Sequence, residues 1–99
     1  MSSNQEKSAF EKKMAAKMKA WNAEIEKLEA RAEEAGADAE IRYRDQLDTL
    51  RAKRDSLRDK LERLHGQSGD AWDEVKSGVD SAWHELQKSL DKARERISK

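Results

Sequence analysis

Apolar residues recur along the first two thirds of the chain in repeated steps of four, three and four residues. Eleven residues then complete three turns, a period of about 3.67 residues per turn that suits a nearly straight helical stripe. Lys17 and Gly36 interrupt this stripe, and Met18 and Ala35 lie beside them. The positions are Phe10, Met14, Lys17, Trp21, Ile25, Leu28, Ala32, Gly36, Ala39, Tyr43, Leu47 and Leu50, followed by heptad spacing at Arg54, Leu57, Leu61 and Leu64.

A second stripe begins after a glycine-containing break, in which Gly66 and Gly69 flank Gln67 and Ser68. Two glycines so close together favour the end of one helix and the start of another, and Gly66 suits the left-handed position after a helix. The second stripe comprises Trp72, Val75, Val79, Trp83, Leu86, Leu90, Ala93 and Ile97. It also contains an internal repeat, because residues 70–75 align with residues 81–86 at a shift of 11 residues.

These patterns predict an all-α protein with one coiled-coil domain over residues 1–99. Because the stripe keeps its phase across Gly36, we expect a long helix over about 4–65, and a shorter one over about 70–97. A short connection makes neighbouring helices antiparallel, so the two would form a helical hairpin. The residues expected to pack this hairpin are Tyr43, Leu47, Leu50, Leu57, Leu61, Leu64, Trp72, Val75, Val79, Trp83, Leu86 and Leu90.

The alternative is a break at Gly36. Residues 4–35, 38–65 and 70–97 would then form three helices of similar length and fold into a monomeric three-helix bundle. Asp38 could cap the second of these helices.

In the hairpin, the shorter helix would leave the first part of the long helix uncovered. A long uncovered apolar stripe usually marks an interface. We therefore expect a homo-oligomer, most simply an antiparallel dimer. Its self-association interface would comprise Phe10, Met14, Met18, Trp21, Ile25 and Leu28.

Charge and composition narrow the classes of function. Charged residues make up 42% of the chain, and 21 Lys and Arg balance 21 Asp and Glu. A nucleic-acid-binding protein needs a basic face, so nucleic acid is not an expected partner. The chain has no cysteine, which excludes disulfides and thiolate chemistry. No apolar run is long enough for a signal peptide or a membrane span, so the expected location is the cytoplasm.

Residues capable of catalysis are sparse. His84 follows Asp80 by four residues, a spacing that can hold a metal, but a histidine beside an acid on a helix surface is the simpler interpretation. His65 lies at a predicted helix end, where a positive charge suits the helix dipole. We therefore expect no enzyme activity, no cofactor and no metal.

Two other functions are compatible with the sequence. The segment from Lys12 to Trp21 combines lysines with apolar residues and could lie on a lipid surface. An alternative is a desiccation protectant that folds on drying, since 11-residue repeats also occur in such hydrophilic chains.

The C-terminal motif adds a resemblance. Residues 71–79 (Ala-Trp-Asp-Glu-Val-Lys-Ser-Gly-Val), followed by residues 82–86 (Ala-Trp-His-Glu-Leu), resemble the tail of a family of small bacterial coiled-coil proteins related to stress. The resemblance extends over about residues 20–97. It implies a cytoplasmic, non-catalytic bacterial protein associated with stress and identifies no site residues. Within the motif, Trp72 and Trp83 are expected to pack, and Gly78 to let a neighbouring helix approach.

Overall fold

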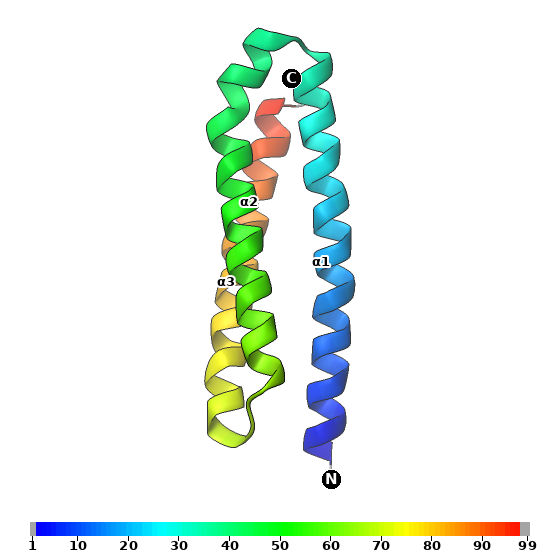
Figure 1. Ribbon diagram of the computed structural model, residues 1–99, viewed down its shortest axis with the longest axis vertical. Helices are drawn as coiled ribbons and strands as arrows, with labels where there is room; N and C mark the ends of the chain where they lie inside the picture. The colour runs from blue at the N-terminus through cyan, green and yellow to red at the C-terminus, as the bar shows by residue number, and fades with distance from the viewer. Residues whose placement is uncertain (1, 98–99) are drawn as a thin grey trace.

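Three helices of similar length account for nearly all of the residues described. The computed structural model describes residues 2–97, with side chains from residue 5 onward. The helices are α1 (Ser2–Glu34), α2 (Ala37–His65) and α3 (Gly69–Ile97). They run up, down and up, so that α1 and α3 are parallel and α2 is antiparallel to both (Figure 1). The resulting bundle measures 54 × 18 × 18 Å.

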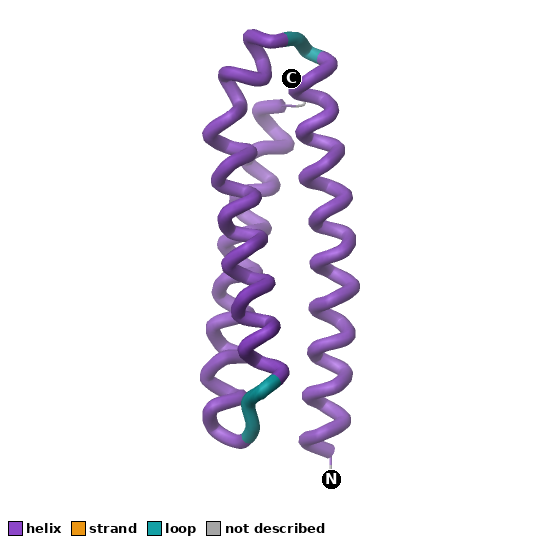
Figure 2. The backbone as a smooth tube through the Cα atoms, in the orientation of Figure 1, coloured by secondary structure: helices purple, strands orange, loops and turns teal. Residues whose placement is uncertain are grey.

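The prediction of an all-α protein is confirmed, and the three-helix bundle is the architecture found. The long helix over about 4–65 was wrong because the chain turns at Ala35 and Gly36, one of the two short connections in Figure 2. Gly36 has φ 108° and ψ 173°, a conformation that essentially only glycine adopts. Its amide donates a hydrogen bond to the Glu33 carbonyl, and its own carbonyl accepts one from the Glu40 amide. One glycine thus ends α1 and begins α2.

The second turn differs from the prediction, which placed Gly66 in the left-handed backbone conformation. Gly66 has φ −89° and ψ 0°, so it is not in the left-handed region. Its amide donates a hydrogen bond to the Arg63 carbonyl, and the Gln67 amide donates one to Leu64. The positive φ, 60°, belongs to Gly69, which is the first residue of α3. The chain therefore ends α2 with a right-handed turn at Gly66, and the left-handed conformation lies at Gly69 instead.

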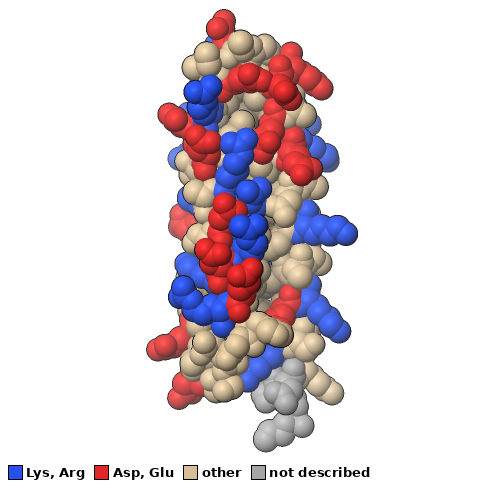
Figure 3. All heavy atoms as spheres, in the orientation of Figure 1, with Lys and Arg blue, Asp and Glu red and all other residues tan. Residues whose placement is uncertain are grey.

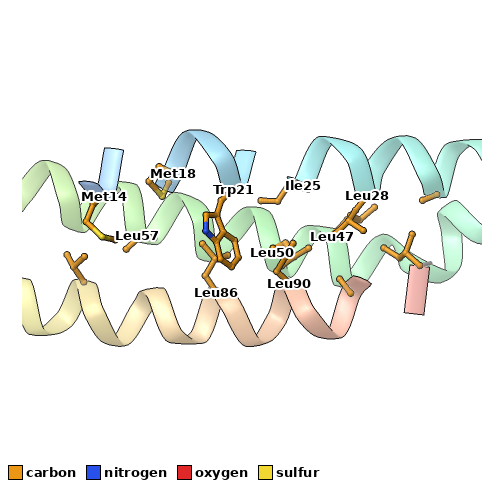
Figure 4. Packing of buried hydrophobic residues seen from close by; sticks show 14 residues of the cluster. Met14, Met18, Trp21, Ile25, Leu28, Leu47, Leu50, Leu57, Leu86 and Leu90 are labelled. Carbon is orange, nitrogen blue, oxygen red and sulfur yellow. The ribbon is translucent and has the colours of Figure 1, made fainter. Parts of the chain in front are cut away.

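The core is a column of apolar side chains along the bundle axis, shown in Figure 4. All buried residues within the described part of the chain are apolar. The 3.67-residue period explains this, because it keeps one face of each long helix turned toward the axis with little supercoiling. The largest fully buried side chains are Ile25, Leu28, Leu50, Leu57, Leu64, Val79 and Leu86.

Gly78 lies in the interior of α3, and the expectation that it admits a neighbouring helix was wrong. A Cβ atom built at Gly78 would meet no heavy atom within 4 Å. Glycine therefore only weakens the helix there, at a cost of about 1 kcal/mol relative to alanine.

We expect Gly78→Ala to stabilise the protein by about 0.5–1 kcal/mol, because alanine loses less backbone entropy in a helix. For a domain of this size the melting temperature should rise by about 4–8 °C per kcal/mol. Thermal unfolding followed by circular dichroism measures the change. A lower melting temperature would show that another surface does approach α3 at this point.

Candidate functional site

The six residues expected to form a self-association interface lie inside the bundle. Met14, Met18, Trp21, Ile25 and Leu28 are buried, and Phe10 is half-buried against the same core. The uncovered stripe was the reason to expect a dimer, and the turn at Gly36 removes it. Since α1 folds back along α2, the chain's own α2 and α3 cover the stripe.

The twelve residues expected to pack the hairpin also lie between helices, now of one three-helix bundle. Eight of them are buried, namely Leu47, Leu50, Leu57, Leu64, Trp72, Val79, Leu86 and Leu90. Tyr43, Leu61, Val75 and Trp83 are partly buried and pack against the core. The stripes therefore identified these interior positions, and α2 and α3 do pack antiparallel to each other. The hairpin prediction lacked the third helix, because α1 of the same chain also packs against both.

Four aromatic residues bridge the two parallel helices. Phe10 of α1 and Trp72 of α3 meet edge to face, with ring centroids 5.8 Å apart at 75°. Trp21 of α1 and Trp83 of α3 repeat this contact at 4.6 Å and 72°. Edge-to-face geometry is the favoured arrangement for aromatic pairs. The two pairs are 11 residues apart on both helices, so the shared period places one pair three turns above the other.

Lysine side chains lie over three of these rings. The ammonium nitrogen of Lys17 is 4.7 Å from the ring centroid of Trp83. Lys7 lies 5.8 Å from Trp72, and Lys76 lies 5.1 Å from Phe10. Ammonium groups within about 6 Å of a ring face are attracted by its electron density, and their stems also cover apolar surface. We call these seven residues the aromatic seam: Phe10, Trp21, Trp72, Trp83, Lys7, Lys17 and Lys76.

The seam joins the two helices whose backbones approach each other least closely. The backbones of α1 and α3 come near each other at far fewer positions than either does with α2. Helix separation depends on the side chains at the contact, and large rings hold two helices farther apart than leucines do. In addition, the buried indole nitrogen of Trp72 has no hydrogen-bond partner within the described part of the chain. A buried polar group left without a partner costs about 1–3 kcal/mol.

Further ion pairs connect α1 to its neighbours between Trp21 and the turn at Gly36. A guanidinium nitrogen of Arg94 on α3 lies 2.9 Å from a carboxylate oxygen of Glu24 on α1, and this hydrogen bond lowers the pKa of Glu24. Arg51 on α2 contacts Glu29 on α1 at 3.2 Å, and that bond raises the pKa of Arg51. These partly exposed pairs each contribute little to stability but help to fix which residues face each other.

Basic and acidic side chains are mixed over the face of the bundle in Figure 3. Many pair within one helix, as Lys76 does with Asp80 at 3.5 Å and Arg51 with Asp48 at 2.9 Å. Because neighbouring charges cancel, no large field of one sign arises on this face. Lys12, Lys13 and Lys19, which suggested a lipid-facing segment, are exposed on α1, whereas Trp21 of that segment is buried.

The histidine and acidic side chains that could support catalysis do not gather in one place within the described part of the chain. Nδ1 of His65 lies 3.1 Å from a carboxylate oxygen of Glu11, but the His65 side chain is 83% exposed. His84 is exposed on α3, and its expected neighbour Asp80 pairs with Lys76. No three histidine or acidic residues gather to form a possible metal site within residues 2–97. A shallow groove of about 420 Å³ between α1 and α2 is lined by residues that include Met18, Asn22, Leu61 and His65.

The lysines of the seam were missed in the sequence. Lys17 seemed to interrupt the apolar stripe, yet it lies at a stripe position because its ammonium group sits over Trp83. A lysine on an apolar stripe, close to a tryptophan in the same helix, was the available signal. Its aromatic partner, Trp83, could not be identified, because residues so far apart in the sequence become neighbours only through the turn at Gly36.

Comparison with protein-family models, with curated proteins and with solved structures found no match for this chain. In the described helices, no segment is both long enough and apolar enough to cross a membrane.

Proposed function

We propose that this chain is a non-catalytic helical protein associated with stress, and that it acts by self-association. The aromatic seam carries this proposal. It joins α1 to α3 through ring pairs 11 residues apart, and the backbones of these two helices approach each other less closely than those of the other two helix pairs. The α1 of a second copy would offer the same rings at the same spacing, so it could make the same edge-to-face contacts with this α3.

The association with stress rests on the C-terminal motif. Its two tryptophans, Trp72 and Trp83, are the residues that α3 contributes to the aromatic rings of the seam. The motif that resembles the stress-related family is therefore also the part of α3 that holds α1. This coincidence favours a role in which the packing of α1 matters to function.

Sedimentation velocity over a wide range of protein concentration tests the proposal. We expect the average mass to rise reversibly from one chain to two as concentration increases. A mass of one chain at every concentration would overturn self-association.

Flotation with vesicles rich in anionic lipid, compared with neutral vesicles, extends the experiment. A chain that floats only with anionic vesicles and stays monomeric without them acts at a lipid surface instead.

The stress association is tested separately by abundance. The amount of this protein in its host should rise after at least one of heat, osmotic, oxidative and drying challenges. Quantitative mass spectrometry before and after each challenge measures it. Constant abundance under all four would remove the stress part of the proposal and leave self-association to be judged by sedimentation.

A further inference from the structure

We propose that two copies of this chain associate by exchanging α1, with Gly36 as the hinge. In the exchanged form, α1, the turn at Ala35 and Gly36, and α2 would become one continuous helix. Each α1 would then pack against the α2 and α3 of the other copy. This inference rests on the proposed self-association. It states that the partner is a second copy of the chain and that the two copies associate by exchanging α1.

The phase of the apolar stripe allows the turn to straighten. Ala32 before the turn and Ala39 after it are both buried, and they are separated by the same steps of four and three residues that hold elsewhere. A continuous helix would therefore present the stripes of α1 and α2 on one face. If the turn had added or removed a residue from this rhythm, the two stripes would point in different directions.

A second copy can restore the ion pairs that α1 makes with α2 within its own chain. Glu11 faces His65 and Glu29 faces Arg51, so the pairing of α1 with α2 is symmetric about residues 38–40. Two antiparallel copies crossing at these residues would restore the same pairs between chains. The side chains near the crossing point include Ala37 and Ala39, which are small enough for helices to approach closely.

Glycine at the hinge favours the closed turn over a continuous helix. The closed turn needs a positive φ at Gly36, which residues with a side chain rarely adopt. A continuous helix needs an ordinary helical φ there, which glycine tolerates less well than alanine does. Glycine thus favours the closed chain on both counts. A Cβ at this position would meet nothing within 4 Å, so a substitution acts through the backbone and not through a clash.

The variant Gly36→Ala tests the hinge. Each closed turn should become at least about tenfold less favourable relative to a continuous helix, and a dimer replaces two turns, so the dissociation constant should fall by about 100-fold or more. Sedimentation equilibrium measures this change. The matched control is Gly78→Ala, which makes the same substitution inside α3 and should leave the dissociation constant unchanged. An equal effect of both variants, or no effect of Gly36→Ala, would overturn the role of the hinge.

Crosslinking distinguishes exchange from other forms of association. The chain lacks cysteine, so the double variant Glu11→Cys, His65→Cys carries only two thiols, at positions that face each other on α1 and α2. Equilibrated at high concentration and treated with a short bifunctional maleimide, it should give covalent dimers on a denaturing gel. The single variant Glu11→Cys should give none, because those thiols lie at opposite ends of an antiparallel dimer.

The remaining outcomes separate the two proposals. Crosslinks confined within single chains of a protein that sediments as a dimer would overturn exchange and keep self-association. Chains that sediment as monomers at every concentration would overturn both.

A variant with Gly-Ser-Gly-Ser inserted after Gly36 relaxes the turn and should stay monomeric, because long hinge loops disfavour exchange. If that variant dimerised with the same dissociation constant as the unmodified chain, exchange through this hinge would be overturned.

Discussion

Trp21→Glu is expected to unfold most of the protein at 25 °C and neutral pH. Trp21 is buried between the helices and meets Trp83 edge to face. Truncating a buried tryptophan costs about 3–5 kcal/mol, and placing a carboxylate in an apolar interior adds a further penalty. A protein of this length has a total stability of only roughly 5–15 kcal/mol. The helical signal in circular dichroism should therefore fall strongly at all protein concentrations.

The matched control for this prediction is Ala20→Glu. Ala20 is the neighbouring residue on α1 and is exposed, so the same new charge should change stability by less than about 0.5 kcal/mol. The pair also distinguishes the two architectures that the sequence permits. If Trp21→Glu lowered only the tendency to dimerise and kept a stable monomer, Trp21 would lie between chains, as the hairpin prediction required.

The interior of this protein could be predicted from the sequence, and its chain path could not. The period of 3.67 residues identifies the inward face of each helix without reference to any neighbour, because it depends only on helix geometry. It says nothing about whether the helix continues. Gly36 sits in phase with the stripe, so the pattern is the same for a straight helix and for a two-residue turn. The choice depends on burying the α1 stripe, which is a property of the whole chain.

Lys17 and Gly36 were the two positions that did not fit the apolar stripe, and the structure accounts for both. Gly36 forms the turn between α1 and α2, and the ammonium group of Lys17 lies over the ring of Trp83 in the aromatic seam. Of the two departures from the regular pattern, Gly36 therefore marks the change in chain direction, and Lys17 marks a contact between α1 and α3. The pairs of the seam were beyond prediction for a physical reason, since residues 62 apart become neighbours only after α1 and α3 lie side by side.

Leu50→Ala is expected to lower the free energy of unfolding by about 3 kcal/mol, through lost burial and the cavity that the missing atoms leave. Leu50 lies on α2, the helix that packs against both others, and is 0% exposed. The melting temperature should fall by about 12–24 °C, since each kcal/mol shifts a domain of this size by about 4–8 °C. Thermal and denaturant unfolding of the same samples give the temperature and the free energy independently.

Ile41→Ala is the informative counterpart, because it removes a similar aliphatic side chain from the same helix at a position that is 64% exposed. In the closed chain its effect should be within about 0.5 kcal/mol of zero. Ile41 also lies next to the crossing point of the proposed exchanged dimer, at residues 38–40. If Ile41→Ala leaves the monomer's stability unchanged but weakens the dimer measured at high concentration, the second copy covers this side chain. A loss as large as that of Leu50→Ala at low concentration would instead mean that α2 is turned differently in the bundle, with Ile41 facing the core.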